Sequence, residues 1–287
     1  MRDVHTLRKN KLVKNEKQKR VYYVRFSLLV FRFSLKNFSL KKMLLQNILF
    51  LDIETVSQKA TYLELDETFQ GLWRHKSKSI LKKYDEPITD EEAANVYESA
   101  GIYAEFGKIM CISVGFLTPN ADGQWTLRLK SFAGDDEKQV LSDFCQLLQK
   151  PFNDPMKHFM CGHNLKEFDI PYICRRMLIN KMPLPKMLDI SGKKPWETKH
   201  LLDTLEMWKF GDGKNYTSLK LLCAVFGFPS PKDDIDGSEV GRVYWQENDV
   251  NRIAVYCEKD VLAVVQLLLS YQLKPLLTEE QIIFVGR

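Results

Sequence analysis

Two acidic side chains stand one residue apart at the end of an apolar run. The stretch NILFLDIET, residues 47–55, is apolar from Ile48 to Leu51, and Asp52 and Glu54 follow with only Ile53 between them. Residues two apart on a strand point to the same face, so the two carboxylates are expected side by side. Like charges held this close repel, and one carboxyl titrates abnormally unless a cation lies between them. For this stretch alone, the alternative is a polar strand end that runs into a loop.

Two further acidic motifs follow later in the chain. The segment HNLKEFD places Asn164 at the head of an expected helix and Asp169 five residues later. The segment YCEKD spaces Tyr256 and Asp260 four residues apart, which puts both on one face of an expected helix. Each motif alone is weakly specific, because short acidic pairs are common. Three of them in this order, on a strand and two helices, favour one shared site.

The ordered set Asp-x-Glu, Asn-x-x-x-Phe-Asp and Tyr-x-x-x-Asp resembles the DEDDy class of 3′–5′ exonucleases, which have a ribonuclease H-like fold. The stretches YAEFGKIMCISVGF (103–116) and DGSEV (236–240) look most like the proofreading exonuclease domain of family B DNA polymerases, in a stand-alone form. The resemblance covers roughly residues 46–272. It implies an α/β fold in which a mixed five-stranded sheet is flanked by helices.

The resemblance also implies two-metal hydrolysis of a phosphodiester. Mg²⁺ or Mn²⁺ ions prefer oxygen ligands, and two such ions roughly 3.5–4 Å apart can activate a water and neutralise the leaving oxygen. By resemblance, Asp52 bridges both ions, and Glu54 and Asp260 hold the ion that carries the water. Asp169 then serves the second ion through water. Tyr256 orients the attacking water, because a hydroxyl with a pKa near 10 positions water better than it deprotonates it.

Several of these residues have a structural alternative. Tyr256 can be a core aromatic with a satisfied hydroxyl. Asn164 can be a helix cap as well as a substrate contact. Trp73, in the segment WRHKSK, is a candidate substrate contact because single strands stack on aromatic side chains, and its alternative is a buried Trp on a solvated helix. His163 is expected to make a structural hydrogen bond, and Asp203 is expected to belong to the scaffold.

Strands and helices alternate along the part of the chain that must position these residues. Residues 57–104 form a polar insertion of helical character beside the catalytic strand, with Thr89 as a helix N-cap and Glu92 three residues on. The order of elements predicts one domain with a mixed sheet. Strands are expected at 46–53, 108–118, 124–132, 157–164 and 200–208, and helices at 135–150, 165–179, 218–227 and 248–273.

The basic charge of the chain lies in its first 42 residues. The 287 residues carry a net charge of +5, yet residues 1–42 hold 13 Lys and Arg against Asp3 and Glu16, so residues 43–287 are net acidic. A nucleic-acid-binding arm, a transit peptide and an extension upstream of a true start at Met43 are the alternatives. The last is favoured, because nothing in 1–42 resembles a packable element. The exonuclease domain is then residues 43–287, and its acidity argues against tight non-specific duplex binding.

These features predict a metal-dependent 3′–5′ exonuclease that releases nucleoside 5′-monophosphates from single-stranded or frayed DNA. An exoribonuclease and a non-catalytic nucleic-acid-binding module are the alternatives. Because 287 residues leave no room for a polymerase, the enzyme is expected to act alone or in trans with a polymerase or repair proteins. Six cysteines without metal-site spacing, and no clear signal or membrane segment, favour a reduced cytoplasmic protein without a membrane partner.

Overall fold

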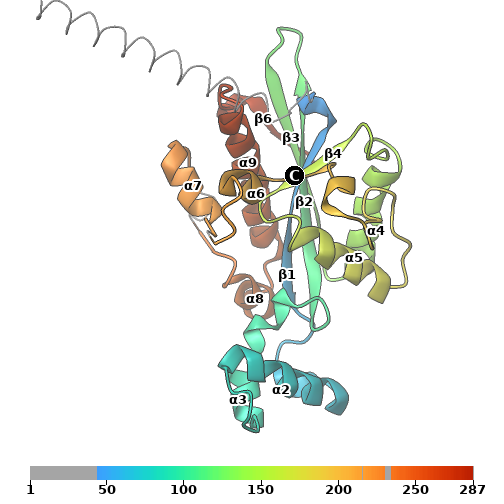
Figure 1. Ribbon diagram of the computed structural model, residues 1–287, viewed down its shortest axis with the longest axis vertical. Coiled ribbons are helices and arrows are strands. Elements are labelled where there is room, and N and C mark those ends of the chain that lie inside the picture. The colour runs from blue at the N-terminus through green and yellow to red at the C-terminus, as the bar shows by residue number, and fades with distance from the viewer. Residues whose placement is uncertain (1–43, 215, 230–233, 287) are drawn as a thin grey trace, which may run out of the picture. The chain divides into compact units, whose positions relative to one another are not determined.

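The computed structural model describes residues 44–214, 216–229 and 234–286, and the predicted extension at 1–42 lies outside these residues. Leu45–Arg287 form one compact unit. Within the described residues, a six-stranded sheet has the order β5-β4-β1-β2-β3-β6 (Figure 1). The strands are β1 (Ile48–Ser57), β2 (Gly107–Pro119), β3 (Trp125–Ala133), β4 (Phe159–Gly162), β5 (Leu201–Asp203) and β6 (Ile282–Phe284).

The predicted mixed sheet is confirmed, but its predicted count of five strands was wrong. β1 pairs antiparallel with β2 and parallel with β4, and β2 and β3 form the predicted hairpin. β5 runs parallel to β4 at one edge. The sixth strand, β6, adds to β3 at the other edge through three residues that are half-buried or exposed. A strand this short and exposed carries no clear alternation in the sequence, which is why it was missed.

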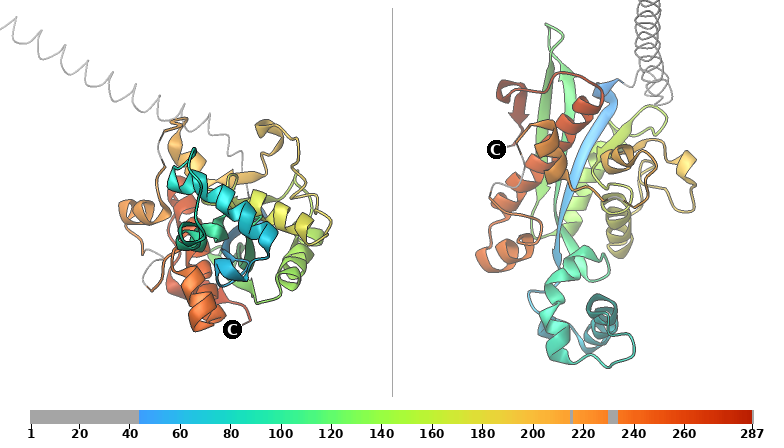
Figure 2. Two further views of the ribbon diagram at one scale, coloured as in Figure 1. Left: turned by 90° about the horizontal axis from the view of Figure 1, so that it is seen from below. Right: turned by 60° about the vertical axis from the view of Figure 1, so that its left-hand side comes forward.

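Helices cover both faces of the sheet (Figures 1 and 2). The long helix α9 (Val250–Tyr271) packs on β1, β2 and β3, and α7 (Leu219–Phe226) packs on α9. The other face is covered by α4 (Glu137–Gln149) and α5 (Asp169–Ile179). Alternate residues of β1 serve the two layers, since Leu49, Leu51 and Ile53 pack in the core with α4 and α5 whereas Val56 packs with α9. No helix among the described residues is long and apolar enough to cross a membrane.

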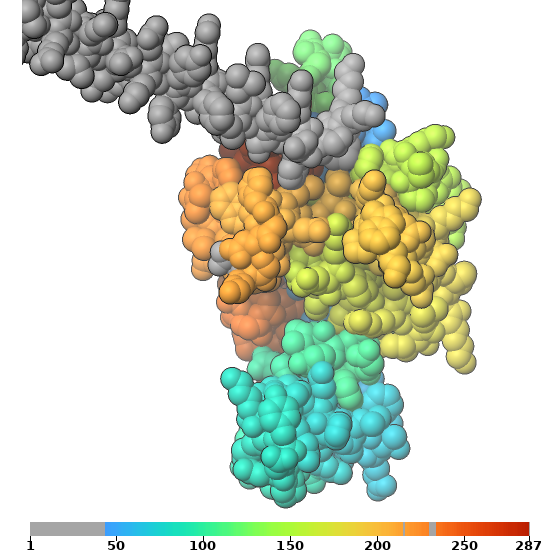
Figure 3. Space-filling model, in the orientation of Figure 1, coloured from blue at the N-terminus to red at the C-terminus, as the bar shows by residue number. Residues whose placement is uncertain are grey.

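A helical segment separates β1 from β2 and has an aromatic core of its own. It consists of η2 (Tyr62–Glu64), α2 (Glu67–Leu81), α3 (Asp90–Asn95) and η3 (Tyr97–Ile102). Thr89 and Glu92 form the predicted capping box at the start of α3. Figure 3 shows this segment, coloured from blue to green, at one end of the unit that contains the sheet. Its buried residues include Tyr62, Leu65, Trp73, Ile88, Ala93, Tyr97, Ala100 and Phe106.

Two predicted boundaries differ from the structure for identifiable reasons. β1 continues to Ser57 beyond its predicted end at residue 53, because Thr55 and Val56 go on pairing with β2. The predicted strand 200–208 stops at Asp203, and α6 (Thr204–Lys209) follows. The Asp203 carboxylate accepts hydrogen bonds from the backbone N–H groups of Leu205 and Glu206, so it is the N-cap of α6.

Candidate active site

Asp52 and Glu54 lie on a part of β1 that is paired on one side only. β4 pairs with β1 through Ile48–Phe50 and then turns away. The register with β2 shifts between Glu54 and Thr55, a bulge of the kind found beside active sites. Gly162 at the end of β4 allows the departing turn to pass close to β1, because a Cβ there would lie 3.0 Å from the Leu51 carbonyl oxygen. The edge of β1 beside the two acids is therefore open to another element.

The turn that fills this space is held by Asp203. Its carboxylate accepts hydrogen bonds from the N–H groups of Asn164 and Lys166, both at 3.0 Å. The His163 ring bonds Thr204 Oγ1 at 2.9 Å and the Thr217 carbonyl at 3.0 Å. His163 and Asp203 therefore have the structural roles expected of them.

Asp169 enters the site as the first residue of α5. The helix begins at Asp169 rather than at the predicted residue 165. Pro171 falls in its first turn, where a missing N–H costs no helical hydrogen bond. Asp169 is only 3% exposed, and its carboxylate accepts a backbone hydrogen bond from Ile53, the residue between Asp52 and Glu54. The first residue of α5 thus places a third carboxylate close to those of Asp52 and Glu54.

The four predicted carboxylates meet at one place, contributed by β1, α5 and α9. Burial raises the pKa of Asp52 well above its usual value, and repulsion from Asp260, Asp169 and Glu54 raises it further. Burial likewise raises the pKa of Asp169 to about 7, with added repulsion from Asp203 and Asp260. Glu54 and Asp260 are also buried. Such mutual repulsion is what a bound divalent cation would remove, and the oxygen donor set suits a hard ion such as Mg²⁺.

Tyr256 lies one helical turn before Asp260 on α9 and is buried. Its hydroxyl hydrogen-bonds with Asp260, and burial together with the nearby carboxylates raises its pKa far above the usual value. A Cβ built at Gly237 would lie 4.0 Å from this hydroxyl, so the backbone at Gly237 lies close to the Tyr256 hydroxyl. The hydroxyl therefore stays protonated at neutral pH and can act as a hydrogen-bond donor.

Cys257 is a member of the site that the sequence analysis did not single out. Its Sγ lies 3.5 Å from Asp52 Oδ2 and 3.4 Å from the Asp52 carbonyl oxygen. Potential ligand atoms of Asp52, Glu54 and Cys257 all lie within 4.8 Å of one another. Burial raises the pKa of the thiol. The available signal was helical position, because Cys257 precedes Asp260 by three residues and shares its face of α9.

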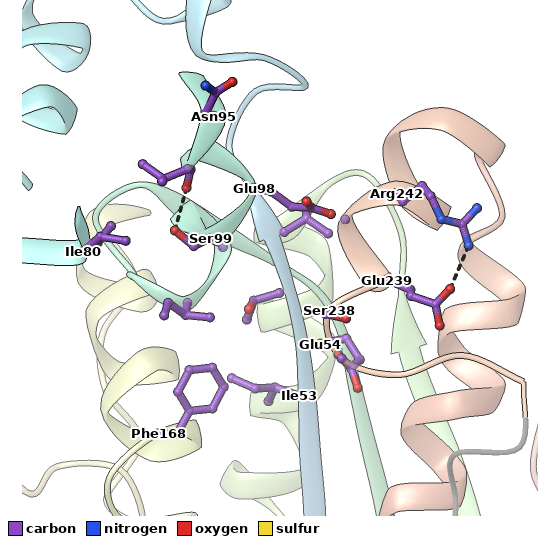
Figure 4. Close-up of a pocket in the computed structure, with 17 residues that line it drawn as sticks. Ile53, Glu54, Ile80, Asn95, Glu98, Ser99, Phe168, Ser238, Glu239 and Arg242 are labelled. Carbon is purple, nitrogen blue, oxygen red and sulfur yellow. Dashed lines mark hydrogen bonds and ion pairs between the residues drawn. The ribbon is translucent and has the colours of Figure 1, made fainter. Parts of the chain in front are cut away.

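A cavity of about 810 Å³ opens beside the acids (Figure 4). Glu54 and Ile53 of β1 border it, with the Phe168 ring beside Ile53. Phe168 is the aromatic residue of the Asn-x-x-x-Phe-Asp motif, so its type and its place before Asp169 were a usable signal for a cavity residue. Asn95, Glu98 and Ser99 of the helical segment line one side, and Ser238, Glu239 and Arg242 line another.

The two predicted substrate contacts lie elsewhere. Asn164, with φ of 65°, borders a separate cavity of about 130 Å³ together with Lys166 and Asp203. Trp73 has no exposed surface, and its Nε1 donates to the Ala93 carbonyl at 2.9 Å. The prediction that Trp73 contacts substrate was wrong, because a fully buried indole in the core of the helical segment cannot stack on a base.

Comparisons with known proteins identify a family for this chain. A family model described as a predicted 3′–5′ exonuclease related to the exonuclease domain of PolB matches residues 102–281. No curated protein matches the chain. The solved family B DNA polymerase from the hyperthermophilic archaeon Pyrobaculum calidifontis is similar over 79% of this chain, with 15% identity and a TM-score of 0.45. The chain spans 24% of that polymerase. Because the family model covers more than half of the chain, the protein belongs to the family of predicted 3′–5′ exonucleases related to the exonuclease domain of PolB.

Proposed function

We propose that the protein is a metal-dependent exonuclease that shortens single-stranded or frayed DNA from its 3′ end and releases nucleoside 5′-monophosphates. One observation carries this proposal: Asp52, Glu54, Asp169 and Asp260 converge from three elements, so that burial and mutual repulsion raise the pKa of Asp52. The site belongs to a chain of a 3′–5′ exonuclease family. Membership of a family related to a DNA polymerase domain supports DNA as the substrate.

The carboxylates would hold two divalent ions, Mg²⁺ or Mn²⁺. When bound, such ions lower the pKa of an attacking water and neutralise charge on the leaving oxygen. Asp52 interacts electrostatically with each of the other three carboxylates, which supports its role as the ligand shared between the ions. Glu54, Asp169 and Asp260 would complete the ligand set from its two sides.

Tyr256 positions the attacking water through its hydroxyl. The hydroxyl hydrogen-bonds with Asp260 and keeps its proton, because burial and the carboxylates raise its pKa. Its single proton is donated to the Asp260 carboxylate, so the hydroxyl oxygen is left to accept a hydrogen bond from the water and does not act as a general base. Its buried ring fixes the position of that oxygen.

The 3′ end of the strand would lie in the cavity beside Glu54. Its volume of about 810 Å³ lies within the range of sites that hold one small ligand, which suits one or two nucleotides. Phe168 and Ile53 provide an apolar wall on which a base can rest. The cavity wall also carries Glu98 and Glu239, so the phosphates are expected to remain near the metal-binding acids.

The proposal is tested with 5′-labelled single-stranded DNA and RNA of one sequence, incubated with Mg²⁺ or Mn²⁺. Wild-type protein is compared with Asp52→Ala and with Asp122→Ala, an exposed Asp in the β2–β3 turn that serves as the matched control. We expect a metal-dependent ladder that shortens from the 3′ end, absent only in Asp52→Ala. Faster shortening of RNA would move the substrate assignment to RNA. Folded wild-type protein that shortens neither substrate with either metal would overturn the proposal.

A further inference from the structure

A sulfur atom lies among the oxygens of the acid site. Cys257 is fully buried on α9, and its thiol contacts Asp52 Oδ2 at 3.5 Å. Cys111, which is opposite Glu54 in the register of β2, hydrogen-bonds with the Cys257 thiol. The Cys257 thiol is therefore hydrogen-bonded to Cys111 and lies close to the carboxylates of Asp52 and Glu54. Hydrolysis with Mg²⁺ does not require this sulfur, because Mg²⁺ is bound by oxygen ligands.

The distance between the Cys257 sulfur and an Asp52 carboxylate oxygen suits a tetrahedral ion. A tetrahedral Zn²⁺ has bonds of about 2.3 Å to sulfur and about 2.0–2.2 Å to oxygen, which places a sulfur and an oxygen ligand about 3.5 Å apart. The Cys257 Sγ to Asp52 Oδ2 distance is 3.5 Å. Glu54 belongs to the same group, in which potential ligand atoms lie within 4.8 Å of one another. Three protein ligands of this type leave the fourth position of a tetrahedral ion open.

We propose that Asp52, Glu54 and Cys257 form a site for a thiophilic divalent ion such as Zn²⁺ or Cd²⁺. On binding, the thiol releases its proton to solvent, and a sulfur–metal bond replaces the S–H bond. Such an ion takes the carboxylates that the proposed exonuclease needs for Mg²⁺ or Mn²⁺, so the two classes of metal compete. The inference rests on the acids of the proposed function but concerns metal binding, which is measurable without any nuclease activity.

Cadmium is the probe, added to metal-free full-length protein in the absence of nucleic acid. Thiolate ligation gives an ultraviolet sulfur-to-cadmium charge-transfer band. The test variant is Cys257→Ser, which keeps a small hydrogen-bond donor beside Asp52. The matched control is Cys174→Ser, which removes a half-buried thiol of α5 that bonds the Leu188 carbonyl. Circular dichroism confirms that each protein is folded.

We expect one Cd²⁺ per chain with the charge-transfer band in wild type and in Cys174→Ser. In Cys257→Ser the band should be lost and the affinity for Cd²⁺ should fall by about tenfold or more. Asp52→Asn should weaken Cd²⁺ binding while keeping the band at saturation. A band of equal strength and affinity in Cys257→Ser, or no band in folded wild type, would overturn the proposal.

A second measurement needs no variant at the site. The ¹¹³Cd resonance of the wild-type complex distinguishes mixed sulfur and oxygen ligation from oxygen ligation alone. A resonance typical of one thiolate with oxygen ligands supports the site, and one typical of oxygen ligands only contradicts it. Because no substrate is present, either result leaves the exonuclease test independent, and a failure of one proposal is distinguishable from a failure of the other.

Discussion

The protein buries acidic side chains in two places, and their surroundings are opposite. Glu137, at the start of α4, accepts hydrogen bonds from the Ile109 N–H at 2.7 Å, from Arg176 Nε at 2.8 Å and from Asn180 Nδ2 at 2.8 Å. Asp52, which is half-buried, instead faces three other carboxylates, two of them on α5 and α9; burial raises its pKa, and repulsion from these carboxylates raises it further. A buried acid surrounded by donors stabilises the fold. A buried acid surrounded by acids destabilises it unless a cation binds, and this difference marks a functional site.

The two places are connected through α5. Asp169 is its first residue, and Arg176, two turns later, pairs with Glu137 at 2.6 Å. Arg176 Nη1 also donates to the Ala104 carbonyl at 2.8 Å, at the end of the segment that leads into β2. The ion pair between Glu137 and Arg176 therefore fixes the position of α5, the helix that carries Asp169 into the acidic cluster. Variants in the two places should separate activity from stability.

Asp52→Ala should have the largest effect, and the effect should be on activity. Removing the shared ligand should lower exonuclease turnover by about a thousandfold or more, because bound metal ions supply several kcal/mol of transition-state stabilisation. The free energy of unfolding of the metal-free protein should stay the same or rise, since one repelling charge is removed. Rate measurement and urea unfolding of the same preparation test both halves. A large loss of stability would place Asp52 with Glu137 among the structural acids.

Glu137→Gln should show the reverse pattern. It leaves the Arg176 charge buried without its partner charge, which should lower the free energy of unfolding by about 3–5 kcal/mol. Turnover per folded molecule should remain within about tenfold of wild type, because no metal-binding acid is changed. The double variant Glu137→Leu, Arg176→Met serves as the control and should recover much of the lost stability. A double variant no more stable than Glu137→Gln would show that the uncompensated charge is not the cause.

Tyr256→Phe should reduce turnover by about 10–100-fold, since the hydroxyl positions the water but the ring still packs. The free energy of unfolding should change by about 1 kcal/mol or less, because one hydrogen bond to Asp260 is lost. Unchanged turnover in Tyr256→Phe would remove the tyrosine from the mechanism and leave it as a core residue.

Asp169→Asn should change the free energy of unfolding of the metal-free protein by an amount that depends on pH. The folded-state pKa of Asp169, about 7, lies above the unfolded value of about 3.9. The folded state therefore binds this proton more tightly, and metal-free stability should fall as the pH rises from about 4 to about 7. In EDTA at pH 8, Asp169→Asn should be more stable than wild type by about 1–2 kcal/mol, and at pH 4 the two should be equal. Urea titrations at both pH values measure this, and a constant difference would contradict the sign.

Most of the strands and helices were predictable from the sequence, because hydrophobic periodicity and helix-capping residues are local properties of the chain. A continuous apolar run located β2, alternation located β3, and the spacing of Tyr256 and Asp260 placed both on one face of α9. Burial was harder to predict, because it depends on tertiary neighbours. Trp73 lies among basic residues in the sequence, yet the aromatic rings of Tyr97 and Phe106 enclose it in the fold.

The residues that were missed depend on contacts between distant segments. Cys257 reaches Asp52 across 205 positions of the chain, and no spacing rule for cysteine pairs detects that contact. Asp203 was expected to belong to the scaffold, but the sequence did not show that its carboxylate caps α6 and holds the turn before Asp169. Such roles appear only when the partner N–H groups are known.

We infer that the four facing acids, unlike the paired Glu137, bind the metal ions of the reaction. Electron paramagnetic resonance of Mn²⁺ counts bound ions directly in wild type, Asp52→Asn and Glu137→Gln, each folded and free of nucleic acid. We predict two Mn²⁺ per chain in wild type and in Glu137→Gln, and weaker or incomplete binding in Asp52→Asn. Equal Mn²⁺ binding by wild type and Asp52→Asn would contradict the account.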